Sequence, residues 1–148
     1  MDKYKYLVLV FIICAVTIVK AQGDETAAKN SLFYYSGYLG KSDKVEFNLQ
    51  LTKLKVSGSY ILEESGALFI FNGRMATDKS GLGVLIYTES NEYVASMEAK
   101  FISDENNFAK EIKGIWRGAD GQSTLPIALK KVAELAYSSD RIPVNLSD

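Results

Sequence analysis

Carboxylates are the side chains in this sequence that could perform acid–base chemistry. Candidate pairs can be drawn from six acidic residues: Glu63, Glu64, Glu89, Glu92, Glu98 and Asp104. Most of them fall at expected turns or on the polar faces of expected strands, where a charged side chain is normally solvated. We therefore predict no catalytic residues and no enzyme activity, with a carboxylate-based enzyme as the last alternative.

Metal and cofactor chemistry finds little support in the composition. The sequence has no histidine and a single cysteine, Cys14, so the usual ligands for zinc, iron and copper are missing. Residues 104–107 offer oxygen ligands that calcium accepts, but the run lacks the glycine and terminal glutamate of a known calcium loop. The whole sequence contains no G-x-S-x-G motif and no phosphate-binding loop. We expect no metal and no cofactor.

Two aromatic residues, Tyr60 and Trp116, are the candidates for ligand contact. Both are expected on the inward faces of strands, and a small eight-stranded barrel encloses little more than its own side chains. We therefore expect the two rings to fill the core, with a ligand floor as the alternative. Gly58 and Gly114, each two residues before one of the rings, are expected to leave room for that ring.

Strands must position these residues. From 45 to 52 apolar and polar residues alternate without a break, which is the period of a strand with one buried face. Similar segments recur at about ten-residue spacing, with turn residues between them. The expected strands cover 31–39, 44–53, 55–63, 67–76, 82–89, 93–102, 111–117 and 123–130. This spacing predicts an all-β fold, an antiparallel eight-stranded up-and-down barrel, with Pro126 at a bulge or an edge.

Two of these segments, 67–76 and 82–89, carry apolar residues on both faces, so both faces should be covered. We expect the C-terminal tail to cover the outer face. The alternative is an interaction surface, for a protein partner or a second copy of the chain. The residues of that surface are Leu68, Ile70, Val84 and Ile86.

The start of the chain predicts export. Lysines precede an apolar run over 7–19, and small residues occupy the last and third-last positions of the segment, Ala21 and Val19, as in a secretory signal peptide. We expect a signal peptide over 1–21, a flexible leader over 22–30, a barrel domain over 31–131 and a helical or irregular tail over 132–148, in which 132–137 could form one or two helical turns. Removal of Lys3, Lys5, Lys20 and Asp2 with the signal changes the net charge from −1 to −3. An acidic domain without a basic cluster is a poor nucleic-acid binder.

Four motifs carry a resemblance: Y-S-G-Y-L-G-K at 35–41, V-S-G-S-Y at 56–60, G-I-W at 114–116 and L-P-I-A-L at 125–129. Over 33–129 the chain resembles a group of small exported bacterial domains, which implies an eight-stranded barrel and an envelope or extracellular location. The run S-G-S-Y at 57–60 resembles the S-G-x-x-Y motif of periplasmic lysozyme inhibitors. It is one residue shorter than that motif, and the cysteines of those inhibitors are absent. The G-x-W strand of lipocalin-like and avidin-like barrels is matched by Gly114 and Trp116, although in those families it opens the chain.

The sequence therefore predicts a secreted or periplasmic, non-enzymatic binding or interaction module. Its expected partner is a protein or a small apolar ligand. We expect no membrane span after cleavage of the signal peptide, and the sequence is compatible with either a monomer or a homodimer. The alternative is an inhibitor of an extracellular or periplasmic hydrolase, which would insert the loop at 41–43 or the loop at 103–108 into a cleft.

Overall fold

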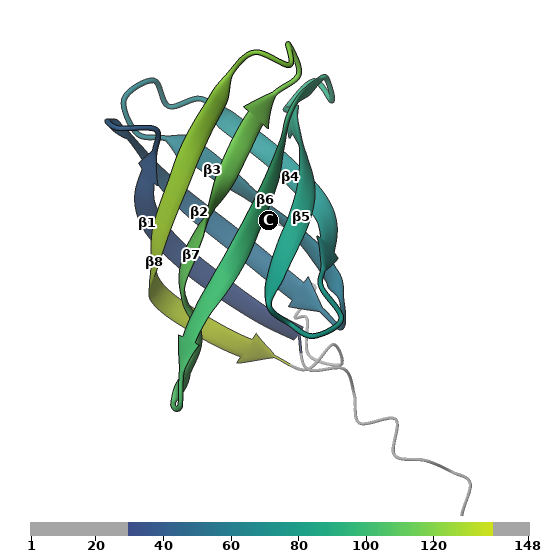
Figure 1. The fold of residues 1–148 in the computed structure, drawn as a ribbon, viewed down its shortest axis with the longest axis vertical. Helices are drawn as coiled ribbons and strands as arrows, with labels where there is room; N and C mark the ends of the chain where they lie inside the picture. The colour runs from purple at the N-terminus through teal and green to yellow at the C-terminus, as the bar shows by residue number, and fades with distance from the viewer. Residues whose placement is uncertain (1–29, 138–148) are drawn as a thin grey trace, which may run out of the picture.

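The computed structural model describes residues 30–137, which form one closed β-barrel (Figure 1). Each strand pairs antiparallel with the next in sequence, and the last closes onto the first. The strands are β1 (Asn30–Leu39), β2 (Asp43–Thr52), β3 (Lys55–Leu62), β4 (Leu68–Met75), β5 (Gly81–Thr88), β6 (Tyr93–Asp104), β7 (Asn107–Gly118) and β8 (Thr124–Tyr137). The predicted all-β, eight-stranded up-and-down fold is confirmed. Residues 30–137 contain no helix long and apolar enough to cross a membrane.

The alternation seen in the sequence decides which side chains face inward. In β2, Val45, Phe47, Leu49 and Leu51 are buried, while Glu46 and Asn48 between them are exposed. The same inward row of apolar residues recurs around the barrel and forms a single core. Burial of these rows is the main source of stability, because the hydrophobic effect scales with the apolar area removed from water.

Aromatic rings fill the middle of that core. Tyr60 stacks between Phe47, at 4.6 Å between ring centroids, and Phe69, at 4.9 Å. Gly58 makes room for a ring, but the ring is Phe71 of β4 and not Tyr60: a Cβ on Gly58 would lie 2.7 Å from Phe71 Cζ. At Gly114 the close neighbour is the backbone of β6 rather than Trp116, because a Cβ there would lie 2.1 Å from the Glu98 carbonyl oxygen.

The C-terminal end of β8 differs from the prediction. The prediction that a helical or irregular tail begins at residue 132 is wrong, because β8 continues as a strand to Tyr137. Its final residues pair with the beginning of β1, from Ala133 opposite Tyr34 to Tyr137 opposite Asn30. Closure of the barrel requires this pairing, since the first residues of β1 would otherwise have a free edge. The remainder of the predicted tail, 138–148, lies outside the described residues, as do the predicted signal peptide and residues 22–29 of the leader.

Pro126 lies at no bulge, but it lies just beyond the end of the β1–β8 ladder, so its β1 side is an edge, one of the two positions predicted for it. The β1–β8 ladder begins one residue later, with Ile127 opposite Leu39, and Gly40 N donates a hydrogen bond of 2.7 Å to the Pro126 carbonyl oxygen. In an antiparallel strand the N–H and C=O of one residue face the same neighbour. The missing N–H of Pro126 therefore faces the end of β1, where no ladder bond is lost.

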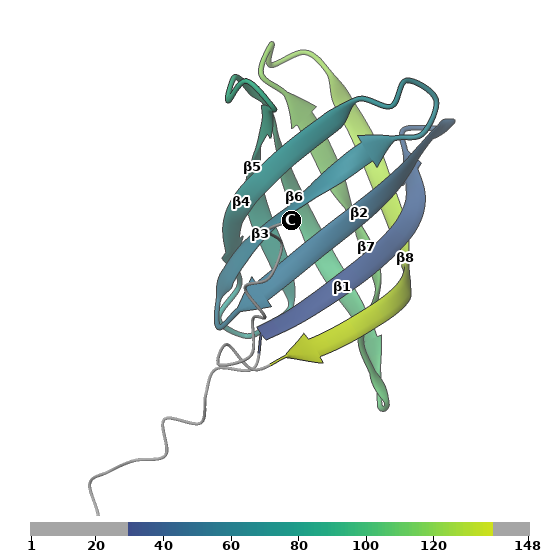
Figure 2. The ribbon, with the colours of Figure 1, turned by 180° about the vertical axis from the view of Figure 1, so that it is seen from behind.

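A bulge bends the lower part of β8. Tyr35 pairs with Lys131 and Tyr34 with Ala133, so that Val132 has no partner in β1. β8 turns at this point and runs beneath the barrel alongside the start of β1, as both views show (Figures 1 and 2). We call the end of the barrel where β1 begins and β8 ends the lower mouth. The turns after β2, β4 and β6 lie at the same end (Figure 1).

Candidate functional site

The predicted interaction surface does not form as one face. Val84 and Ile86 are 3% and 0% exposed and belong to the core, whereas Ile70 is 45% exposed on the outer wall and Leu68 is half-buried beside it. Ile70 pairs with Tyr87, so the outward residues of β5 are Leu85 and Tyr87. The sequence gives two faces for each strand, but it does not tell which face of β4 continues onto which face of β5.

An apolar outer wall nevertheless exists on neighbouring strands. Its exposed members are Ile61, Ile70, Leu85 and Tyr93. Tyr93 meets Tyr87 edge to face, with ring centroids 6.0 Å apart. The described part of the predicted tail, 132–137, pairs with β1 and does not cover this wall.

Tyr60 and Trp116 both belong to the interior. Tyr60 is 2% exposed, so its predicted core role is confirmed, and Trp116 packs half-buried against the same core. Burial raises the pKa of Tyr60 to about 12, and the nearby Trp116 partly offsets this rise. The geometry between the two falls short of a hydrogen bond, so that the buried indole Nε1 has no partner among residues 30–137.

The lower mouth holds a charged pair inside the barrel. Lys131 lies opposite Tyr35 and Glu134 lies opposite Phe33, and both β1 residues are buried. Residues three apart on a regular strand point to opposite faces. The bulge at Val132 brings Lys131 and Glu134 to the inner face together.

Lys131 is almost fully buried, with a side chain 7% exposed. Its Nζ donates to the Phe108 carbonyl oxygen at 2.7 Å and to Glu134 Oε2 at 2.6 Å. It also lies 5.0 Å from the centroid of the Phe33 ring. These three contacts replace the water that the ammonium group loses on burial.

Tyr35 completes the polar network behind the mouth. Its hydroxyl donates to the Ala109 carbonyl oxygen at 2.8 Å, and Ala109 N donates to Ser103 Oγ at 2.7 Å. Burial, and secondly the charge of Glu134, raises the pKa of Tyr35. Ala109 has φ +49°, in the left-handed region, and this irregular segment of β7 is fixed by the two hydrogen bonds.

A cavity of about 420 Å³ opens in front of this network at the lower mouth. Most of its lining is apolar and comes from five different segments: Phe33, Leu51, Leu54, Met75 and Phe108. Ser31, Lys53, Lys79 and Glu134 complete the lining. An apolar cup with a few polar groups at defined places is the usual construction of a small-molecule site.

Comparisons with protein-family models, with curated proteins and with solved structures found no match to this chain.

None of the mouth residues was predicted to bind a small ligand, although Phe108 ends the loop at 103–108 that was considered for insertion into a hydrolase cleft. Every second residue of β8 faces inward, as Leu125, Ile127 and Leu129 do, and Lys131 is the next residue in this row. The period-two pattern could therefore have predicted that Lys131 points inward. Glu134 has no such signal, because the bulge changes its face.

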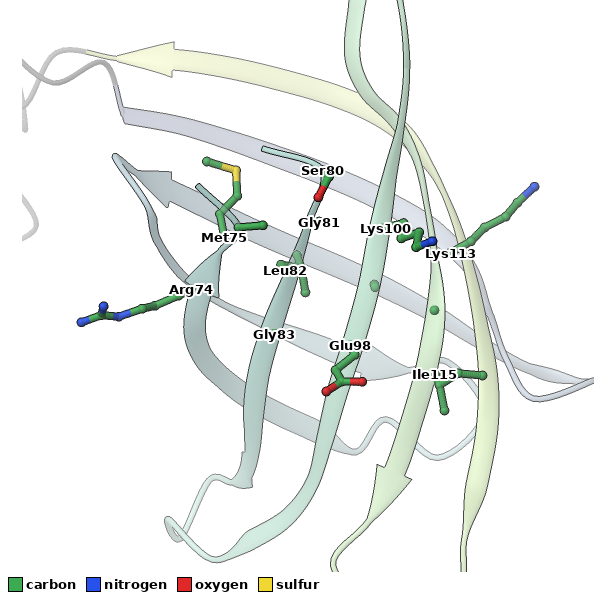
Figure 3. Close-up of a pocket in the computed structure, with 13 residues that line it drawn as sticks. Arg74, Met75, Ser80, Gly81, Leu82, Gly83, Glu98, Lys100, Lys113 and Ile115 are labelled. Carbon is green, nitrogen blue, oxygen red and sulfur yellow. The ribbon is translucent and has the colours of Figure 1, made fainter. Parts of the chain in front are cut away.

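A second pocket lies on the outer wall, across β4 to β7. It measures about 680 Å³, and its floor includes Gly83, where a Cβ would meet nothing within 4 Å. Figure 3 shows Arg74 and Lys113 pointing away from each other, to opposite sides of the pocket. Glu98 is already paired with Arg117 at 3.0 Å. The charged groups of this pocket therefore do not converge on one point.

Three of the carboxylates weighed as catalytic or calcium-binding groups, Glu63, Glu98 and Asp104, form surface ion pairs. Glu63 pairs with Lys44 at 2.8 Å. Asp104 accepts a hydrogen bond from Asn106 N at 3.1 Å and pairs with Lys110 at 3.2 Å, and these contacts lower its pKa. Residues 30–137 contain no group of three or more potential metal-ligating side chains.

Proposed function

We propose that this chain is an exported, non-enzymatic binding module that holds a small, largely apolar ligand in the lower mouth of its barrel. The observation that carries the proposal is the mouth cavity, in which apolar side chains of β1, β2, β4, β7 and the turn at Leu54 converge. A cavity of about 420 Å³ is of the size that small-molecule sites have.

The polar groups behind the cavity support binding rather than catalysis. Tyr35 and Lys131 donate to the backbone carbonyls of Ala109 and Phe108. Both contacts hold β7 against β1 and β8. A catalytic acid or base would need to face the ligand with its proton free to move.

Export follows from the predicted signal peptide over 1–21, and we place the mature module in the periplasm or outside the cell. The N-terminal residue of the purified, exported protein tests this part of the proposal. Mass spectrometry should find a chain that begins at Gln22. A product that keeps residues 1–21 would contradict export by cleavage.

Titration with N-phenyl-1-naphthylamine, a neutral fluorescent probe, tests the binding site. Leu54→Ser should weaken probe binding severalfold, because Leu54 lines the cavity. Ile70→Ser is the matched control: both side chains are partly exposed leucine or isoleucine, at 38% and 45%, but Ile70 lies on the outer wall. Equal weakening by both changes, or no binding by the folded protein, would refute the mouth as the site.

One observation favours the alternative, inhibition of an extracellular hydrolase. The turn between β6 and β7 projects beyond the lower rim of the barrel (Figure 1). The Ser103 contact to Ala109 and the Asp104 pair with Lys110 stiffen this hairpin. Inhibition of a secreted glycosidase or protease that is lost in Asn106→Ala, while probe binding is unchanged, would support this function instead.

A further inference from the structure

We infer that the ligand of the lower mouth carries an acidic group, a carboxylate or sulfonate, and that Lys53 and Lys79 bind it. This inference rests on the proposed function and specifies the class of ligand: an amphipathic acid with a small apolar body.

The charges around the cavity do not balance. Three charged side chains line it, Lys53, Lys79 and Glu134. Glu134 is already neutralised by Lys131 behind it, at 2.6 Å. In the described part of the chain neither Lys53 nor Lys79 makes an ion pair, so the cavity keeps two uncompensated positive charges.

Both lysines occupy turn positions that would suit another residue better. Lys53, in the turn after β2, and Lys79, in the turn after β4, each have φ +59°. Glycine or asparagine adopts this left-handed conformation with less strain than lysine does. The turns themselves therefore do not require lysine, and an anion at the mouth would give both ammonium groups a partner.

The two turns are fastened to the rim of the cavity. Met75 N donates to the Leu54 carbonyl oxygen at 2.8 Å, which joins the turn after β2 to the end of β4. Lys79 N donates to the Ala76 carbonyl oxygen at 2.9 Å and closes the turn after β4. The backbone thus holds both lysines beside Met75 and Leu54, which line the same cavity.

An amphipathic acid fits this arrangement. Its apolar body would lie on Phe33 and Phe108, and its acidic group would lie at the rim near Lys53 and Lys79. Ion pairs that remain partly in water are weak and are screened by salt. We therefore expect an acidic ligand to bind about three- to tenfold more tightly than its neutral counterpart, with the difference shrinking as salt is added.

Two fluorescent probes test the inference on the mature protein. 1-Anilinonaphthalene-8-sulfonate and N-phenyl-1-naphthylamine share one ring system, and only the first carries a sulfonate. Lys53→Gln combined with Lys79→Gln should remove the preference for the sulfonate, by weakening binding of the sulfonate severalfold more than binding of the neutral probe. Lys100→Gln, on the outer wall, is the control and should keep the preference.

The outcomes separate this inference from the proposed function. If the neutral probe binds at the mouth, but the sulfonate binds no better and the double variant changes nothing, the acidic ligand is refuted and the binding module stands. If Lys100→Gln removes the preference as fully as the double variant does, overall charge and not the rim causes it, and the inference also fails. If neither probe binds the folded protein, both proposals fail.

Discussion

Lys131 Nζ lies 2.6 Å from the Glu134 carboxylate on the inner face of β8 at the lower mouth, although residues three apart on a regular strand would point to opposite faces. Val132, which has no partner in β1 and is 66% exposed, makes the difference. It takes up the extra position in β8, so Glu134 returns to the inner face. One unpaired residue thus creates the charged pair behind the lower mouth and bends the strand that closes the barrel.

The two members of this pair should tolerate replacement unequally. Glu134→Gln leaves the buried ammonium of Lys131 without a counterion, and we expect it to lower the free energy of unfolding by about 1–2 kcal/mol, since Glu134 is itself 44% exposed. Lys131→Met removes the buried charge and keeps much of the volume, so its effect should stay within about 1 kcal/mol. Urea denaturation at neutral pH measures both. A larger loss for Lys131→Met than for Glu134→Gln would contradict this asymmetry.

The sequence predicts the strands of this barrel well where period two is unbroken. The row Val45, Phe47, Leu49 and Leu51 is buried as predicted, because one face of β2 is entirely apolar. The prediction fails where long-range pairing decides. Residues 132–137 show apolar residues at helical spacing, and it is their contact with β1, from Ala133 opposite Tyr34 to Tyr137 opposite Asn30, that makes them a strand. No local pattern contains that contact.

The site was missed for the same reason. The mouth combines Phe33, Leu54, Met75 and Phe108, which lie in separate strands and turns, and only barrel closure brings them together. The predicted interaction surface was wrong because the sequence does not give the register between β4 and β5. Val84 and Ile86 face inward, on the side of Phe71, rather than outward, on the side of Ile70.

Replacement of Gly58 and of Gly83 by alanine should have different effects on stability. A Cβ on Gly58 would lie 1.9 Å from the Asn48 carbonyl oxygen and 2.7 Å from Phe71 Cζ, so Gly58→Ala must displace β2 or the ring. We expect it to lower the free energy of unfolding by about 1–3 kcal/mol. Gly83→Ala faces open space and should be neutral or slightly stabilising. Similar losses for both changes would show that β propensity, and not packing, controls these positions.

Alkaline pH should destabilise the barrel through its buried tyrosines. Burial raises the pKa of Tyr60 from 10.0 to about 12 in the folded state. Its contribution is fully present below about pH 10, where the unfolded chain is also neutral, and is lost as pH rises toward 12, at about 1.4 kcal/mol per pH unit. Tyr35, whose pKa burial also raises, acts in the same direction.

Tyr60→Phe isolates this effect. The variant should lose less stability between pH 9 and pH 11 than the unmodified protein does, by about 1 kcal/mol. Denaturation curves at both pH values give the difference. Parallel losses in the two proteins would show that Tyr60 ionises in the folded state as readily as in the unfolded chain.

A chain that ends at Lys131 should not form a stable barrel. It lacks the residues of β8 that pair with β1 from Asn30 to Tyr34, and it lacks Glu134, the counterion of Lys131. An open edge on β1 should then promote association between chains. A chain that ends at Tyr137 keeps every described strand and is the control. Circular dichroism and size-exclusion chromatography compare the two. A monomeric, cooperatively folding product from the shorter chain would mean that barrel closure does not depend on the end of β8.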